Sequence, residues 1–282
     1  MESISQIAIL RSHLQQWRQA GQRIAFVPTM GNLHRGHMDL VDHARQWADR
    51  VVVSIFVNPT QFGPNEDYQA YPRTLAQDSQ LLAENQVDVL FHPTAVEMYP
   101  GGLPARVRIE VPGISELLCG AVRPGHFAGV ATVVAKLFNA VQPDLAIFGE
   151  KDYQQLLVIR RLTQELLLPI QIVGVLTRRD VDGLAMSSRN QYLTAEERKI
   201  APGLYATLQA VARQLTAGQR GFSALEEAAF KELNKKGFNP DYLAIRRASD
   251  LGVPSSDDKD IVILVAAYLG KARLIDNLRI SI

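Results

Sequence analysis

The stretch Pro28-Thr29-Met30-Gly31-Asn32-Leu33-His34-Arg35-Gly36-His37 decides the fold, because an apolar run leads into it and an amphipathic pattern leads out. Residues 23–27 (Arg-Ile-Ala-Phe-Val) predict a buried strand. From Gly36 to Ala48 apolar residues recur at helical spacing, and residues 51–57 predict a second strand. The segment therefore predicts one strand-helix-strand unit of the length that a parallel crossover needs.

His34 and His37 lie at the start of this predicted helix. The first amides of a helix lack intrahelical partners, and the aligned peptide dipoles make that end attractive to anions. Two imidazoles three residues apart would face the same bound anion. Alternatively, the histidines cap the helix and pack, or they bind zinc. Zinc is disfavoured because the chain has one cysteine and its other histidines are scattered at 13, 43, 92 and 126. An anion site is the favoured interpretation.

Composition limits the class of protein. The chain has 282 residues, of which 47% are hydrophobic and 21% charged, so it can form a core and has no disordered character. The net charge of +1 argues against general nucleic-acid binding. Cys119 is the only cysteine, which indicates a reducing compartment. The longest apolar run, residues 261–269, is about half a membrane span. We expect a cytoplasmic protein with neither nucleic-acid nor membrane partners.

The remaining chain continues the pattern of alternating strands and helices. A helix over residues 4–20 is expected to pack on a sheet that begins at Arg23. Helices over 74–85, 129–141 and from about 150 to 166 alternate with strands over 87–91, 144–148 and 170–176. The Pro- and Gly-rich stretch 97–118, with a short alternating piece at 107–111, predicts an excursion or a small hairpin rather than a core element. These elements predict an α/β fold with a Rossmann-like parallel sheet, in a catalytic domain over 1–177.

The pattern changes beyond Asn190. Thr194 and Glu197 form a capping box at the start of a helix, and Pro202 predicts a kink or a second helix. A further helix over 223–236 precedes strands over 241–247, 261–269 and 272–280 without long crossovers. We expect a smaller C-terminal α+β domain over 178–282, built on an antiparallel sheet and acting as a lid.

Polar side chains flank the predicted strands at separate points of the chain. Asn58 and Gln61 follow the second strand, and Lys151 follows the strand at 144–148. Arg123 and His126 precede a helix, and residues 187–189 (Ser-Ser-Arg) follow the strand at 170–176. Because the carboxyl ends of parallel strands meet at one edge, these side chains would surround a nucleotide-sized, anion-binding cleft. Neither a P-loop nor a Gly-x-Gly-x-x-Gly motif is present.

The His-x-Gly-His at 34–37, with the Ser-rich basic loop at 186–190, resembles the nucleotidyltransferase superfamily and the class I aminoacyl-tRNA synthetases. A closer resemblance is to the pantothenate synthetase family. It rests on seven motifs in order, at residues 28–31, 56–59, 61–63, 71–74, 123–127, 149–155 and 182–190.

The resemblance implies a ligase that condenses (R)-pantoate with beta-alanine, using ATP and Mg²⁺, through a pantoyl adenylate, and that is a homodimer. Attack on the α-phosphorus builds negative charge that positioned donors stabilise. By that logic His34, His37 and Lys151 are the catalytic residues, and the family pattern makes His37 a proton donor. The ATP-binding residues are Met30, Gly31, Asn32, Leu33, His34, Arg35, Gly36, His37, Gly149, Glu150, Lys151, Asp152, Arg178, Met186, Ser187, Ser188 and Arg189.

The same resemblance assigns binding residues to pantoate and beta-alanine. Gln61 and Gln155 bind pantoate, and Gln61 also binds beta-alanine. An amide would orient the pantoate carboxylate with less ground-state stabilisation than an arginine would give. Asn58, Arg123 and His126 are further substrate contacts. Asp78 is the magnesium ligand, although Gln77 stands beside it where the family often has an acidic residue.

Two rival functions remain open at this point. An adenylyltransferase would leave AMP on its product, and a nucleotide-binding regulatory or RNA-binding protein would have lost catalysis. The set of His34, His37, Lys151 and Arg189 and the near-neutral charge disfavour the second rival. Pyrophosphate exchange that depends on pantoate would separate these functions.

Overall fold

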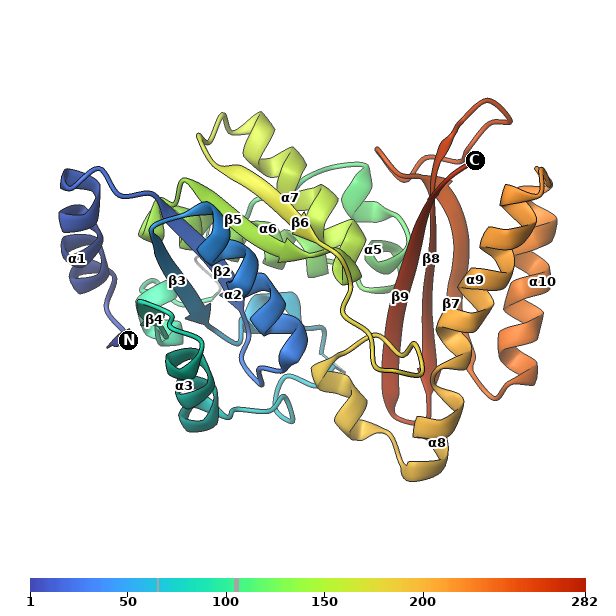
Figure 1. Ribbon diagram of the computed structural model, residues 1–282, viewed down its shortest axis with the longest axis horizontal. Coiled ribbons are helices and arrows are strands. Elements are labelled where there is room, and N and C mark those ends of the chain that lie inside the picture. Colours follow the sequence, from blue (N-terminus) through green and yellow to red (C-terminus); the bar gives the residue numbers. More distant parts are fainter. Residues whose placement is uncertain (65, 104–106) are drawn as a thin grey trace.

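A six-stranded parallel sheet forms the larger part of the molecule (Figure 1). The computed structural model describes residues 1–64, 66–103 and 107–282. The strand order is β1-β4-β3-β2-β5-β6. In chain order the strands are β1 (Glu2–Ile4), β2 (Ile24–Thr29), β3 (Arg50–Ile55), β4 (Val89–Phe91), β5 (Leu145–Gly149) and β6 (Gln171–Val175). The predicted α/β class with a Rossmann-like parallel sheet is confirmed.

Helices cover both faces of this sheet. One face packs against α1 (Ile7–Gln19), α6 (His126–Val141) and α7 (Tyr153–Glu165), in a core that includes Leu14, Phe26 and Phe138. The other face packs against α2 (Arg35–Trp47) and α3 (Leu75–Glu84), and the core between the layers includes Val27, Val41, Val51, Val53 and Leu82. Because both faces are covered, these strands are apolar runs rather than alternating patterns.

A three-stranded antiparallel sheet, β7-β8-β9, lies beside the large sheet (Figure 1). Its strands are β7 (Asn239–Arg247), β8 (Asp260–Leu269) and β9 (Ala272–Ser281). One face packs against α9 (Gly203–Thr216) and α10 (Phe222–Lys235). The other face contributes Val262 and Leu264 to a cluster with Tyr153 and Leu157 of α7. The small sheet is therefore packed directly on the larger one's helical layer, and the domain boundary at residue 177 stays a prediction.

The capping box and the helix break are confirmed. Thr194 and Glu197 cap α8 (Ala195–Ile200) reciprocally, and Pro202 separates α8 from α9. Proline cannot donate a backbone hydrogen bond inside a helix, so the chain begins a new helix there.

One prediction at the edge of the fold is wrong. The sheet begins at β1 rather than at Arg23, because residues 2–4 form a short edge strand that pairs with β4, and α1 begins only at Ile7.

The stretch predicted as an excursion or small hairpin has no strand at its alternating residues 107–111. Instead, the Ile109 amide donates to Thr132 Oγ1 at 2.9 Å, and Val111 packs into a cluster on α6 and α7. Residues 104–106 of that predicted excursion lie outside the described residues.

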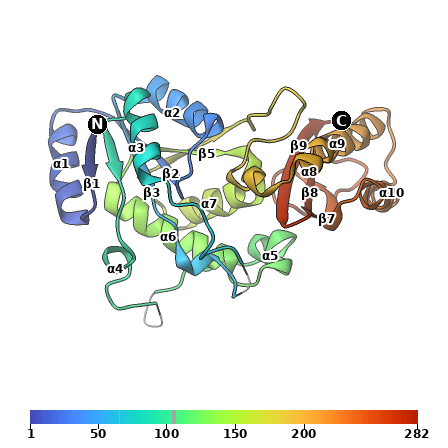
Figure 2. The same ribbon diagram turned by 90° about the horizontal axis from the view of Figure 1, so that it is seen from below.

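Short helices complete the fold: α4 (Ala95–Met98), α5 (Cys119–Val122), and the 3₁₀ turns η1 (Pro59–Gln61), η2 (Ile114–Glu116), η3 (Glu150–Asp152) and η4 (Ser188–Tyr192). Seen from below, α5 lies between the two sheets (Figure 2). No helix in the described ranges combines the length and the apolar character needed to cross a membrane.

Candidate active site

The switch point of the large sheet lies between β2 and β5. The chain leaves β2 toward β3 and β4, and later returns to the other side of β2 to form β5 and β6. Open α/β sheets bind ligands in the crevice outside the carboxyl ends of strands at such a point. The loop to His34 follows β2, and η3 with Lys151 follows β5. Both segments that were predicted to contact phosphates therefore begin at the switch point.

The loop after β2 is fixed by its backbone and by Asp78. Gly31 has a φ of 83°, and a Cβ at this position would lie 3.0 Å from Ile55 Cγ2. Asn32 follows with a φ of 51°. Asp78, which is 3% exposed, accepts hydrogen bonds from the amides of Asn32 at 2.9 Å and Leu33 at 2.8 Å. The carboxylate therefore holds the loop in a conformation that would otherwise be strained.

His34 and His37 form a reciprocal cap at the start of α2. His34 Nδ1 accepts from the Gly36 amide at 3.2 Å, and His37 Nδ1 accepts from the His34 amide at 3.3 Å. A nitrogen that accepts a hydrogen bond carries no proton, so these contacts assign the proton of each neutral ring to Nε2. The ring centroids are 4.2 Å apart. The capping interpretation and the anion-site interpretation are thus compatible, because Nε2–H stays free to donate.

Both rings are held neutral. Burial, assisted by the charge of Lys151, lowers the pKa of His34 to about 4. Burial and the neighbouring His34 and Lys151 lower the pKa of His37 to about 3. The unfolded chain binds protons at these histidines below pH 6.5 while the folded chain does not, so acidification from about pH 6.5 toward 4 lowers the free energy of unfolding.

A cleft with two compartments opens at the switch point. The larger compartment is about 790 Å³ and reaches the small sheet, and the smaller is about 230 Å³ and reaches the histidines. The two compartments share lining residues Met30, Gln61, Lys151, Asp152, Gln155, Ser187 and Arg189. The smaller one has an apolar wall formed by Phe56, Val130, Val133, Val134, Leu137 and Phe148. This arrangement suits a ligand with an apolar body and a charged end.

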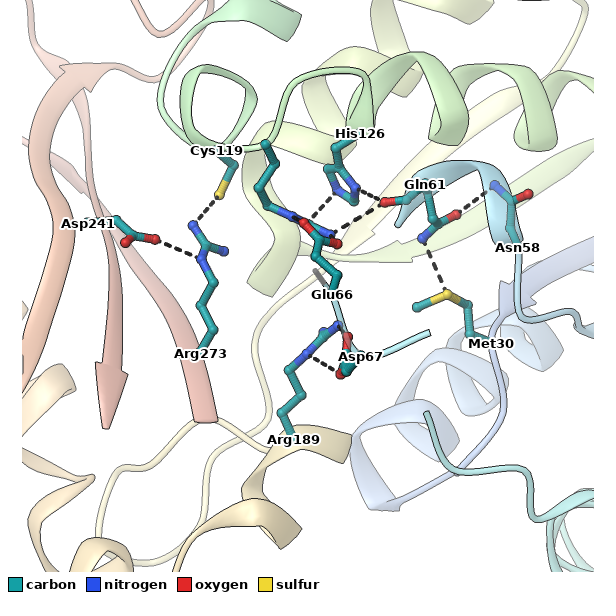
Figure 3. Close-up of polar contacts among 11 residues, drawn as sticks. Met30, Asn58, Gln61, Glu66, Asp67, Cys119, His126, Arg189, Asp241 and Arg273 are labelled. Carbon is teal, nitrogen blue, oxygen red and sulfur yellow. Dashed lines mark hydrogen bonds and ion pairs between the residues drawn. The ribbon is translucent and has the colours of Figure 1, made fainter. Parts of the chain in front are cut away.

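The cations of the cleft differ in their partners. Arg189 makes a bidentate pair with Asp67, with distances of 3.0 and 3.2 Å (Figure 3). Arg123 pairs with Glu66 at 2.5 Å. Lys151 has no ion pair within 4.0 Å among the residues that the structure describes. Its ammonium group is therefore available to an anion without first breaking a salt bridge.

Gln61 is held by a network that includes the three further substrate contacts predicted from the sequence (Figure 3). Its Oε1 accepts from Asn58 Nδ2 at 3.0 Å, and its Nε2 lies 3.3 Å from Met30 Sδ. His126 Nδ1–H donates to the Gln61 carbonyl at 2.8 Å, while Arg123 lies 3.0 Å from His126 Nε2. Burial and Arg123 lower the pKa of His126 to about 4. A sulfur is a weak acceptor, so the Gln61 amide can turn its donors to a stronger one.

The structure brings most of the predicted site residues to the cleft. The lining includes Met30, His34, Gly36, His37, Gln61, Arg123, His126, Gly149, Lys151, Asp152, Gln155, Arg178, Met186, Ser187, Ser188 and Arg189. Other predicted residues do not line the cleft: Gly31, Asn32, Leu33, Arg35, Asn58, Asp78 and Glu150. Arg35 is exposed and faces Asp39 at 3.9 Å, whereas Asn58 is 1% exposed and supports Gln61.

Asp78 is a poor candidate for a magnesium ligand. Its two oxygens accept from the backbone and from Thr74 Oγ1 at 3.1 Å. Within residues 1–64, 66–103 and 107–282, no group of three or more His, Cys, Asp or Glu side chains could hold a metal ion. Mg²⁺ commonly binds through one or two carboxylates together with substrate phosphates. Asp152 lines both compartments and fits that mode better than Asp78 does.

Sequence reasoning missed the wall that comes from the small sheet: Asp241, Tyr242, Tyr268, Lys271, Arg273, Asp276 and Asn277. Arg273 donates to Asp241 at 2.8 Å and lies 3.6 Å from Cys119 Sγ (Figure 3). These residues lie within strands, except Lys271 in the turn between β8 and β9, and carry no local motif. Only the packing of the small sheet on α7 brings them to the cleft.

Known proteins resemble the chain over nearly its whole length. A sequence model of the family "Pantoate-beta-alanine ligase" matches residues 2–279. A pantothenate synthetase of Shewanella amazonensis is 58% identical over 96% of each chain, and one of Ectopseudomonas mendocina is 56% identical over 100% of this chain and 99% of that one.

Two crystal structures are similar over the same extent. Pantothenate synthetase from Thermus thermophilus is 49% identical, with a TM-score of 0.92 and 99% coverage of both chains. Pantoate-beta-alanine ligase from Francisella tularensis, complexed with beta-gamma ATP and beta-alanine, is 40% identical. Its TM-score is 0.83, with 99% of this chain and 97% of that chain covered.

Proposed function

The chain belongs to the pantoate-beta-alanine ligase family, and we propose that the cleft at its β2/β5 switch point performs the family reaction. The protein is an ATP-dependent ligase that condenses (R)-pantoate with beta-alanine to give pantothenate, AMP and pyrophosphate. The observation that carries the assignment of the site is the position of Lys151, which lines both compartments and shares the smaller one with the two histidines.

The reaction has two steps. First, a carboxylate oxygen of pantoate bonds to the α-phosphorus of ATP while the bond to the departing pyrophosphate breaks, leaving pantoyl adenylate. Second, the amine of beta-alanine attacks the acyl carbon, loses a proton and displaces AMP. The first step gathers negative charge on the phosphates, and preorganised donors stabilise that charge.

Each of the cleft residues stabilises this charge in a different way. Nε2–H of His34 and of His37 donates to phosphate oxygens, and Lys151 supplies the positive charge. His37 acts as a hydrogen-bond donor rather than as an acid, because its pKa of about 3 leaves no imidazolium near neutral pH. Ser187, Ser188 and Arg189 close over the pyrophosphate. Ser188 Oγ already donates to the Asn32 carbonyl at 3.1 Å and joins the two walls.

The smaller compartment takes pantoate. The dimethyl carbon of pantoate would pack on the apolar side chains of α6, including Val133, Val134 and Leu137. Gln61 and Gln155 line the boundary between the compartments and would orient the carboxylate toward the phosphates. Beta-alanine enters through the larger compartment, where Gln61 is again exposed to the ligand. The loop from Arg178 to Arg189 serves as a lid that keeps water from the adenylate.

Other properties follow from the family resemblance. Mg²⁺ would arrive on the ATP phosphates and neutralise part of their charge, with Asp152, which lines both compartments, as the candidate carboxylate. The protein would act as a homodimer in the cytoplasm.

Pyrophosphate exchange tests the proposal most directly. Purified protein should exchange labelled pyrophosphate into ATP when pantoate is present and beta-alanine is absent. Adding beta-alanine should release AMP and form pantothenate. Exchange without pantoate, or a product that keeps AMP after the amine is added, would contradict the proposed reaction.

A further inference from the structure

Asp276 and Asn277 are adjacent polar residues in the middle of β9, and both are buried, with 4% and 7% exposed. Successive side chains of a strand point to opposite faces of the sheet. Asp276 pairs in register with Val265, which packs against the helices α9 and α10. Asn277 pairs with Leu264, which packs against α7 of the larger part. One dipeptide therefore reaches both sides of the small sheet.

Asn277 holds the backbone of the turn that carries Lys151. Its Nδ2 donates to the Glu150 carbonyl at 2.8 Å and to the Lys151 carbonyl at 3.0 Å. β9 is the strand of the small sheet that faces the large sheet (Figure 1), and it contacts η3 directly. Two hydrogen bonds from one amide to successive carbonyls fix the peptide planes on both sides of the Lys151 Cα.

Lys151 needs such support because of its chemistry. The ammonium group stands on a flexible four-carbon stem and has no ion pair among the described residues. Its direction into the cleft is therefore set by the backbone from which it projects. A small change of that backbone would move the charge relative to the phosphates, and such misplacement is costly in catalysis.

Asp276 holds a different part of the site. It forms a bidentate pair with Arg179, with distances of 2.6 and 2.9 Å, and the Arg179 guanidinium lies 3.5 Å from the ring centroid of Tyr205. Arg179 belongs to the loop that leads to Ser187. The neighbouring residue thus offers a comparison within the same strand, because its carboxylate bonds to Arg179 of the loop and to the Asn277 amide, at 2.8 Å, and not to the Glu150 or Lys151 carbonyl.

We propose that Asn277 is a positioning residue for the ligase reaction, which fixes the Glu150–Lys151 backbone from the small sheet and so directs Lys151 toward the phosphates. This role rests on the proposed function of Lys151. It couples the small sheet to the phosphate site without any contact between Asn277 and the reacting atoms.

A double-mutant cycle tests this role. Asn277→Ala should lower the kcat of pantoate-dependent exchange by about 10- to 100-fold, with a smaller change in the KM for ATP. In a Lys151→Ala background the same change should lower kcat by less than about twofold, because the group that it directs is gone. Asn277→Ser keeps one donor and should recover part of the rate. Asp276→Asn should lower the rate by a similar factor in both backgrounds.

Other results would overturn the proposal. An Asn277→Ala effect of the same size in both backgrounds would show a role that does not pass through Lys151, and an unchanged kcat would show no role. Arg279→Gln serves as the control, and this variant should keep the wild-type rate. Arg279 lies on the same strand as Asn277, and the change breaks its exposed ion pair with Asp260 of β8. If Asn277→Ala does not fold by circular dichroism, the cycle is run with Asn277→Ser. Absence of exchange in the wild type would refute the proposed function instead.

Discussion

The two walls of the cleft are built in opposite ways. The histidine wall, residues 30–37, is one continuous segment whose two imidazole donors are uncharged and cap each other locally, while Asp78 holds the loop backbone before them. The basic wall, formed by Lys151 and residues 187–189, comes from two segments and carries positive charge. Its supports are distant in sequence, including Asp67, Asp276 and Asn277. The difference indicates that dipoles are preorganised locally, while the charges depend on the packing of the two sheets.

The largest effect should come from removing the charge. Lys151→Ala should lower the kcat of pantoate-dependent exchange by about 1000-fold, at the upper end of losses for a donor to developing charge. Lys151→Arg should not restore it, since a planar guanidinium differs in shape and reach. Steady-state exchange kinetics measure both. A loss in kcat of less than tenfold for Lys151→Ala would show that Lys151 is not the main charge of the basic wall.

Removing His37, a neutral hydrogen-bond donor, should lower kcat less than removing Lys151 does. His37→Ala should lower the same kcat by roughly 100-fold, because neutral hydrogen bonds are weaker than charge-assisted ones. His43→Ala is the matched control on the same helix, since His43 bonds to the Asp39 carbonyl and does not line the cleft. Equal losses in kcat for His37→Ala and Lys151→Ala would show that neutral and charged donors contribute equally, which contradicts the distinction drawn between the two walls.

The support that Asp78 gives to the histidine wall predicts a stability effect. Asp78→Asn should lower the free energy of unfolding by about 1.5–3 kcal/mol, because a buried carboxylate that accepts two amide hydrogen bonds is lost. Urea denaturation measures the change. The Mg²⁺ concentration that gives half-maximal exchange should stay the same, and a strong increase would instead support Asp78 as a metal ligand.

The smallest effect is expected from changing Asp67, the carboxylate that pairs with Arg189 of the basic wall. Asp67→Asn should strengthen the binding of inorganic pyrophosphate by about three- to tenfold, because the anion no longer competes with Asp67 for Arg189. Glu66→Gln is the paired comparison, and it should leave pyrophosphate binding near the wild-type value, since Glu66 pairs with Arg123. Titration calorimetry measures both variants. Weaker pyrophosphate binding in Asp67→Asn would mean that Asp67 orients Arg189 rather than competing for it.

The same contrast explains what the sequence could predict. The helix start at His34, the strand before it and the Pro202 break depend on residues within a few positions, so local patterns revealed them. Lys151 and Arg189 were found because they follow strands that end at the same edge. β1 was missed because three edge residues carry too little pattern, and Asn277 because only tertiary packing brings it to η3. The part that Asp78 plays in holding the loop was missed for a related reason, since its partners lie 45 and 46 residues away.

The central claim is that the histidine wall is neutral while the basic wall carries the charge. Nuclear magnetic resonance of ¹⁵N-labelled histidines across pH 5–8 tests it directly, with His34→Gln and His37→Gln to assign the signals. Both rings should keep the neutral pattern with the proton on Nε2 throughout this range, because their pKa values are about 4 and 3. A titration of either ring near pH 6.5 would contradict the account.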